Sequence, residues 1–144
     1  MSEILLIEDS EIDAAQAESA LKIVGIKNPV HRLSDGAAAM RLLADIAEDP
    51  NGAPPGVIFL DVKLPLVTGF EILRWMRDQK IFKRTLKIIF STLDDTDTIK
   101  EAYHLGANSF LNKPVRPDDL RELIITYPRY WGINGSSQVA SMTP

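Results

Sequence analysis

Hydrophobic residues gather in five short runs along the chain, separated by longer polar and mixed segments. The clearest runs, Ile4–Ile7 and Val57–Leu60, are wholly apolar and do not alternate with polar positions. A strand covered on both faces has this pattern, because neither of its side-chain rows meets water. The runs predicted as strands are Ile4–Ile7, Val30–Leu33, Val57–Leu60, Lys87–Phe90 and Ser109–Leu111.

Between these runs, apolar residues recur at intervals of three and four, the spacing of one face of a helix. The pattern predicts helices from about Ser10 to Val24, from Gly36 to Ala47, after Thr68, from Thr96 to Leu105, and from Pro117 onward. Residues suited to cap or end these helices are Ser10, Gly25, Asp35, Thr68, Gly106 and Pro128. Five helices therefore alternate with five strands.

This alternation predicts an α/β fold with a doubly wound, five-stranded parallel sheet and helices on both faces. Right-handed crossovers leave few topologies, and the flavodoxin-like strand order 2-1-3-4-5 is the natural candidate. In that order the first and third strands are neighbours. Glu8 and Asp9, which follow the first strand, would then lie beside Asp61, which follows the third.

Length and composition limit the classes of protein that need to be considered. The 144 residues suit one domain, with 45% hydrophobic and 25% charged residues and no cysteine. The net charge of −4 argues against a nucleic-acid partner. No apolar run approaches the ~20 residues that span a bilayer. Met1 to Glu3 lead straight into a strand without a basic leader, so we expect a cytoplasmic protein without a membrane partner.

One stretch in the middle of the acidic chain is basic. We interpret it as the solvated face of a helix and the loop after it, with a partner-docking patch as the alternative. Its residues are Arg74, Arg77, Lys80, Lys83, Arg84 and Lys87.

The acids at the strand ends predict a site for a metal and a phosphate. Glu8, Asp9 and Asp61 would repel one another, and a hard divalent cation relieves that repulsion. Carboxylates without cysteine or histidine ligands suit Mg²⁺, which keeps waters and phosphate oxygens in its shell. A carboxylate beside a phosphoryl group can act as the nucleophile and form an aspartyl phosphate. Lys113 would neutralise oxygen charge, and Ser91 or Thr92 would donate a hydroxyl.

From about Ile4 to Tyr127, the chain resembles a response regulator receiver domain of two-component signalling. The matching pieces are Leu6-Ile7-Glu8-Asp9-Ser10, Leu60-Asp61-Val62-Lys63-Leu64-Pro65 with Gly69, Phe90-Ser91-Thr92, and Phe110-Leu111-Asn112-Lys113-Pro114. The resemblance implies a receiver domain over residues 1–131. We expect the Gly/Ser-rich residues 132–144 to be a disordered tail.

The resemblance also implies roles for individual residues. Asp61 would be the phosphoacceptor, taking its phosphoryl group from a histidine kinase. Asp9 would bind Mg²⁺ directly and Glu8 through water, with the backbone carbonyl of Lys63 as the third protein ligand. The remaining implied roles are the switch hydroxyl of Ser91, the phosphoryl-pairing ammonium of Lys113, the switch aromatic Phe110 and a cis peptide between Lys113 and Pro114.

Three features depart from the family pattern. The side chain of Lys63 could pair with the phosphoryl group or obstruct attacking water, which leaves the phosphoryl lifetime open. Thr92 is bulkier than the small residue common after the switch hydroxyl, and it could restrict access of the phosphodonor. About 16 residues follow the last helix, too few for a DNA-binding domain. We therefore expect the output to be contact with a downstream protein.

The loop Glu48–Gly56 and the aromatic segment Tyr127–Trp131 look most like small stand-alone regulators associated with bacterial phytochrome kinases. Two alternatives stay open for Tyr130 and Trp131: packing within the domain, or contact in a homodimer. We expect a signalling switch whose only catalysis is its own phosphotransfer and dephosphorylation. The competing hypotheses are a constitutive binding module with the same fold and an aspartate-nucleophile phosphohydrolase.

Overall fold

Five parallel strands form the centre of the protein in a computed structural model, which describes residues 2–133. The strands are β1 (Ile4–Ile7), β2 (Val30–Leu33), β3 (Val57–Asp61), β4 (Leu86–Ser91) and β5 (Ser109–Asn112). They pair in the order β2-β1-β3-β4-β5. In this register Ile7 of β1 lies opposite Leu60 of β3. The predicted fold class and strand order are confirmed.

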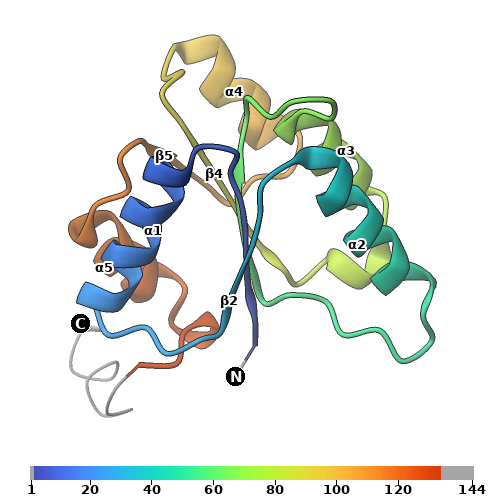
Figure 1. Cartoon of the computed structure of the whole chain (residues 1–144), viewed down its shortest axis with the longest axis horizontal. Coiled ribbons are helices and arrows are strands. Elements are labelled where there is room, and N and C mark those ends of the chain that lie inside the picture. The colour runs from blue at the N-terminus through green and yellow to red at the C-terminus, as the bar shows by residue number, and fades with distance from the viewer. Residues whose placement is uncertain (1, 134–144) are drawn as a thin grey trace.

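Helices cover both faces of the sheet, as Figure 1 shows. They are α1 (Glu11–Ile23), α2 (Gly36–Glu48), α3 (Gly69–Arg77), α4 (Thr96–His104) and α5 (Pro117–Thr126), with 3-10 turns η1 (Lys80–Phe82) and η2 (Pro128–Tyr130). Two apolar layers result. Ile4 and Leu6 of β1 join the layer under α1 and α5, whereas Leu5 and Ile7 join the layer under α2, α3 and α4. Both side-chain rows of β1 are buried, which explains its unbroken apolar sequence.

The predicted helix caps are present. The side chains of Ser10, Asp35 and Thr68 accept hydrogen bonds from backbone N–H groups in the first turns of α1, α2 and α3. Gly25 and Gly106 follow α1 and α4 with φ of 82° and 106°, a conformation that glycine adopts without strain. These local signals therefore set the element boundaries to within one or two residues of the prediction.

Lys87 corrects the interpretation of the basic stretch as wholly solvated. Its residue is 8% exposed, and its Nζ donates to the carbonyl oxygens of Phe82 at 2.7 Å and Thr85 at 3.1 Å. Burial lowers the pKa of the Lys87 ammonium. Lys87 therefore links the start of β4 to η1, because its long aliphatic chain lets the ammonium reach the carbonyl groups of Phe82 and Thr85.

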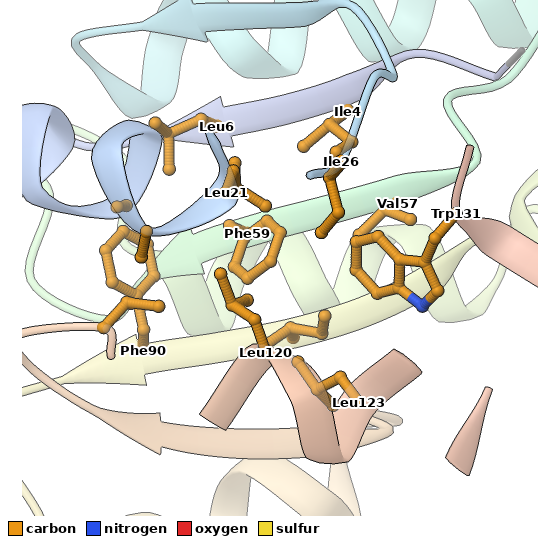
Figure 2. Close-up of a cluster of buried hydrophobic side chains, with 14 of the residues drawn as sticks. Ile4, Leu6, Leu21, Ile26, Val57, Phe59, Phe90, Leu120, Leu123 and Trp131 are labelled. Atoms are coloured by element: carbon orange, nitrogen blue, oxygen red, sulfur yellow. The ribbon is translucent and has the colours of Figure 1, made fainter. Parts of the chain in front are cut away.

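The aromatic segment after α5 packs within the domain. Trp131 is buried in the layer under α1 and α5, where its ring lies 6.4 Å from that of Phe59 (Figure 2). Gly132 N donates to Asn28 Oδ1 at 2.7 Å, and Ile133 forms an antiparallel bridge with Ile26. Of the two alternatives for Trp131, the structure shows packing within the chain. The expected tail lies outside the described residues from position 134 onward.

Among residues 2–133, no helix combines the length and the hydrophobicity needed to cross a bilayer.

Candidate functional site

Three carboxylates meet where β1 and β3 end. Glu8 and Asp9 follow β1 directly, and Asp61 is the last residue of the neighbouring β3. One carboxylate oxygen of each lies within 4.8 Å of the others. Glu8 and Asp61 are buried, whereas Asp9 is exposed. Adjacent parallel strands thus bring together acids that are more than 50 residues apart in the sequence.

Lys113 reaches this cluster from the loop after β5. Its backbone N–H donates to Ser91 O at 3.1 Å, and the Lys113–Pro114 peptide that follows is cis. Its ammonium contacts Glu8 Oε1 and lies 3.1 Å from Asp61 Oδ2. It also lies 5.1 Å from the centre of the Phe90 ring. The side chain is 9% exposed, so the ammonium is held inside the cluster and away from bulk water.

The charges of the site perturb one another. Burial and, after it, the neighbouring Asp61 carboxylate raise the pKa of Glu8 to about 8, and the contact with Lys113 lowers it by less than these raise it. Burial alone would lower the pKa of Lys113, but its contacts with Glu8 and Asp61 outweigh this and raise it. One lysine is therefore too little positive charge for the buried acids, and a divalent cation would supply the remainder.

The loop after Asp61 is held close to the cluster. Lys63 N donates to Asp61 Oδ1 at 3.2 Å, while the Lys63 residue itself is exposed. Gly69, the first residue of α3, donates its N–H to Val62 O. A Cβ at Gly69 would lie 2.0 Å from Asp61 O, so only glycine lets α3 begin this near to the site. The exposed Leu66 between them has φ of 71°.

The other residues predicted for the site lie on β4 and β5. Ser91 is buried at the end of β4, directly after the residue that pairs with Asp61, and its Oγ accepts from Leu93 N at 3.0 Å. Thr92 is exposed. Phe110 of β5 is partly buried and packs on the layer under α2, α3 and α4. The structure therefore brings the side chains of Glu8, Asp9, Asp61 and Lys113 together in one cluster. Ser91 lies at the end of the neighbouring strand β4.

Sequence reasoning missed two residues that contact this site. Arg32 of β2 donates from Nε and Nη2 to Glu8 O, at 3.2 and 3.0 Å, and so fixes the loop that carries both acids. Asp13, in the first turn of α1, places Oδ2 3.2 Å from Lys113 Nζ. The sequence offered one sign of this contact: Asp13 follows Asp9 by four residues, so it stays near the end of the first strand.

Comparison with known proteins agrees with this geometry. A family model described as the response regulator receiver domain matches residues 4–125. Response regulator Rcp1 of Synechocystis sp. is 31% identical over 128 residues, which make up 89% of this chain and 87% of Rcp1. The Mn²⁺-bound form of Rcp1 superposes with a TM-score of 0.71, covering 88% of this chain and 94% of that chain.

Two further solved structures are similar along most of their length. The bacteriophytochrome response regulator AtBRR is 26% identical with a TM-score of 0.78, covering 94% of this chain and 98% of its own. The phosphorylated cyanobacterial phytochrome response regulator RcpA is 28% identical with a TM-score of 0.72, covering 90% and 93%. The chain belongs to the response regulator receiver domain family, and its relatives include regulators associated with phytochromes.

Proposed function

We propose that this protein is a single-domain response regulator that accepts a phosphoryl group on Asp61 from a sensor histidine kinase. The observation that carries the proposal is one buried lysine ammonium in contact with two buried carboxylates, beside a third carboxylate. Phosphoryl transfer requires mainly positioning and neutralisation of oxygen charge, and these groups provide both. The similarity to phytochrome response regulators supports a phytochrome-type kinase as the donor.

The oxygen donors present fit Mg²⁺. Asp9 and Asp61 would hold it directly, with Glu8 through water and the backbone carbonyl of Lys63 completing the protein ligands. When bound, Mg²⁺ supplies the positive charge that phosphoryl oxygens and crowded carboxylates need. The raised pKa of Glu8 supports this assignment, because burial and the neighbouring Asp61 carboxylate both disfavour a second negative charge, which Lys113 alone does not balance.

The protein's own residues would divide the work of transfer among them. A carboxylate oxygen of Asp61 forms the new bond to phosphorus while the bond to the donor imidazole breaks. Lys113 holds a phosphoryl oxygen through its ammonium, and the Ser91 hydroxyl donates to another. Thr92 borders the same strand end and limits the approach of the donor.

The output would be a change in which proteins the domain contacts. Once Ser91 turns toward the phosphoryl group, Phe110 on the neighbouring β5 repacks, and the surface formed by α4, β5 and α5 changes shape. A downstream protein, or a second copy of the chain in a homodimer, would recognise that surface. No nucleic acid is needed for this output.

Incubation with acetyl phosphate and Mg²⁺, followed by intact-mass measurement, tests the proposal. We expect the wild type to gain one phosphoryl group and Asp61→Asn to gain none. Asp45→Asn, which changes an exposed acid on α2, should behave as the wild type. Chelation of Mg²⁺ should abolish the gain.

An unmodified wild type would refute the proposal and favour the constitutive binding module. Full modification of Asp61→Asn would refute Asp61 as the acceptor. Sustained turnover of phosphate monoesters would instead favour the phosphohydrolase hypothesis.

A further inference from the structure

The Lys113 ammonium is surrounded by carboxylates on three sides. It contacts Glu8 Oε1, lies 3.1 Å from Asp61 Oδ2 and lies 3.2 Å from Asp13 Oδ2. A lysine ammonium has three N–H donors. One of them forms a hydrogen bond with Asp13 Oδ2, whereas the contacts of the ammonium with Glu8 and Asp61 are close ion pairs.

The three carboxylates differ in their access to water. The Glu8 side chain is 0% exposed and that of Asp61 is 4% exposed, whereas that of Asp13 is 31% exposed. Water can replace the lysine at Asp13 at little cost, whereas Glu8 and Asp61 are shielded from water and would lose more if the lysine left them. Asp13 is therefore the contact that is easiest to release.

The position of Asp13 is built into α1. Its backbone N–H donates to Ser10 Oγ at 3.2 Å, the capping bond that starts the helix. The Asp13 backbone is therefore held by the cap while its carboxylate meets Lys113, a residue 100 positions away in the sequence.

We propose that Asp13 is a positioning residue that holds the Lys113 ammonium in the unphosphorylated state and competes with the incoming phosphoryl oxygen for it. This inference rests on the proposed function of Asp61. A phosphoryl oxygen that pairs with Lys113 competes with the hydrogen bond from the ammonium to Asp13, and water replaces that bond most readily because Asp13 is the most exposed of the three carboxylates. The contact between Asp13 and Lys113 thus favours the unphosphorylated state, slows phosphorylation and speeds its reversal.

Neutralising Asp13 should weaken its hold on the Lys113 ammonium before the phosphoryl group arrives. We expect Asp13→Asn to raise the rate constant of phosphorylation by acetyl phosphate with Mg²⁺ about two- to tenfold, and to lengthen the phosphoryl lifetime by a similar factor. Asp13→Ala, which also removes the acceptor atom, should show at least as large an effect.

Glu11→Gln is the matched control. Glu11 lies in the same first turn of α1, is exposed and has the same charge, but among residues 2–133 the ion pairs of Lys113 are with Glu8, Asp13 and Asp61 and not with Glu11. If general repulsion of the anionic donor or the helix dipole were the cause, Glu11→Gln would accelerate the reaction as much as Asp13→Asn. Equal effects in the two variants, or no effect of Asp13→Asn, would overturn the inference.

A second measurement does not depend on phosphorylation. In the unphosphorylated protein, the ¹⁵N resonance of the Lys113 ammonium can be assigned by its loss in Lys113→Arg. Its hydrogens should exchange with water faster in Asp13→Asn than in the wild type, and at the wild-type rate in Glu11→Gln. Unchanged exchange in Asp13→Asn would overturn the holding role.

The two failures are distinguishable. A wild type that gains no phosphate refutes the proposed function and this inference with it. A wild type that is phosphorylated normally, with an Asp13→Asn variant that matches it in rate, refutes the role of Asp13 alone.

Discussion

Lys63 lies two residues after the proposed phosphoacceptor Asp61, and its backbone and its side chain face different parts of the proposed mechanism. Its N–H donates to Asp61 Oδ1, and its carbonyl is the ligand we assign to Mg²⁺. The residue is exposed, so its side chain is not enclosed by the core. A substitution at this position can therefore alter the side chain without removing either backbone group.

Lys63→Ala should shorten the phosphoryl lifetime. The ammonium of Lys63 can pair with a phosphoryl oxygen or obstruct attacking water, and either action slows hydrolysis. Because the side chain is exposed, we expect a modest effect, with a half-life about two- to fivefold shorter. Loss of phosphate measured by intact mass after donor removal gives the half-life. Lys22→Ala, at an exposed lysine in the last turn of α1, is the control, and an unchanged half-life in Lys63→Ala would refute the shielding role.

The segment formed by η2 and residues 131–133 is an integral part of the packing against α1 and β3. Asn28 joins it to the rest of the domain. Its Nδ2 donates to Ser2 O at 2.8 Å and Tyr130 O at 3.1 Å, and its Oδ1 accepts from Gly132 N. One buried amide therefore links the first residues of the chain to the segment that follows α5.

Asn28→Ala should destabilise the domain by about 2–4 kcal/mol, since three hydrogen bonds are lost at a site shielded from water. The midpoint and slope of urea unfolding, followed by circular dichroism, give the free energy of unfolding. Asn51→Ala, in the exposed loop after α2, should change it by less than about 0.5 kcal/mol. Equal free energies of unfolding for Asn28→Ala and Asn51→Ala would show that Asn28 does not hold the segment formed by η2 and residues 131–133.

The two apolar layers share the sheet between them, and each contains one tryptophan. Trp131 packs on Phe59 in the layer under α1 and α5 (Figure 2). Trp75 packs on Phe82 in the layer under α2, α3 and α4, with ring centres 5.8 Å apart. Strands β1, β3 and β4 each contribute side chains to both layers. Loss of packing in one layer therefore disturbs the strands on which the other layer rests.

Unfolding should therefore be a single transition that both tryptophans report. Trp131→Phe leaves Trp75 as the reporter, and it removes a buried indole N–H that has no hydrogen-bond partner among the described residues. Trp75→Phe leaves Trp131. Within each variant, we expect urea midpoints from fluorescence and from circular dichroism to coincide. Separate midpoints in either variant would show that the two layers unfold independently.

Local patterns were enough to predict the strands, the helix caps and the strand order. Ser10, Asp35 and Thr68 act within one turn of their own helices, so their effect can be inferred from their neighbours alone. Asp61 could be placed beside Glu8 because parallel strands end on the same side of a sheet. The acid cluster with its lysine was predictable for the same reason.

Side-chain contacts between distant segments could not be predicted in this way. Asp13 and Lys113 meet because α1 packs beside the loop after β5, and Lys87 bends its ammonium under η1. Trp131 lies in the core on a segment that Asn28 and the Ile26–Ile133 bridge hold against the domain. No local pattern encodes these contacts, since each depends on the relative placement of two elements that touch only after folding. The amino-acid sequence alone thus specifies which groups the site contains, and the packing of α1 against the sheet decides which carboxylates share its lysine.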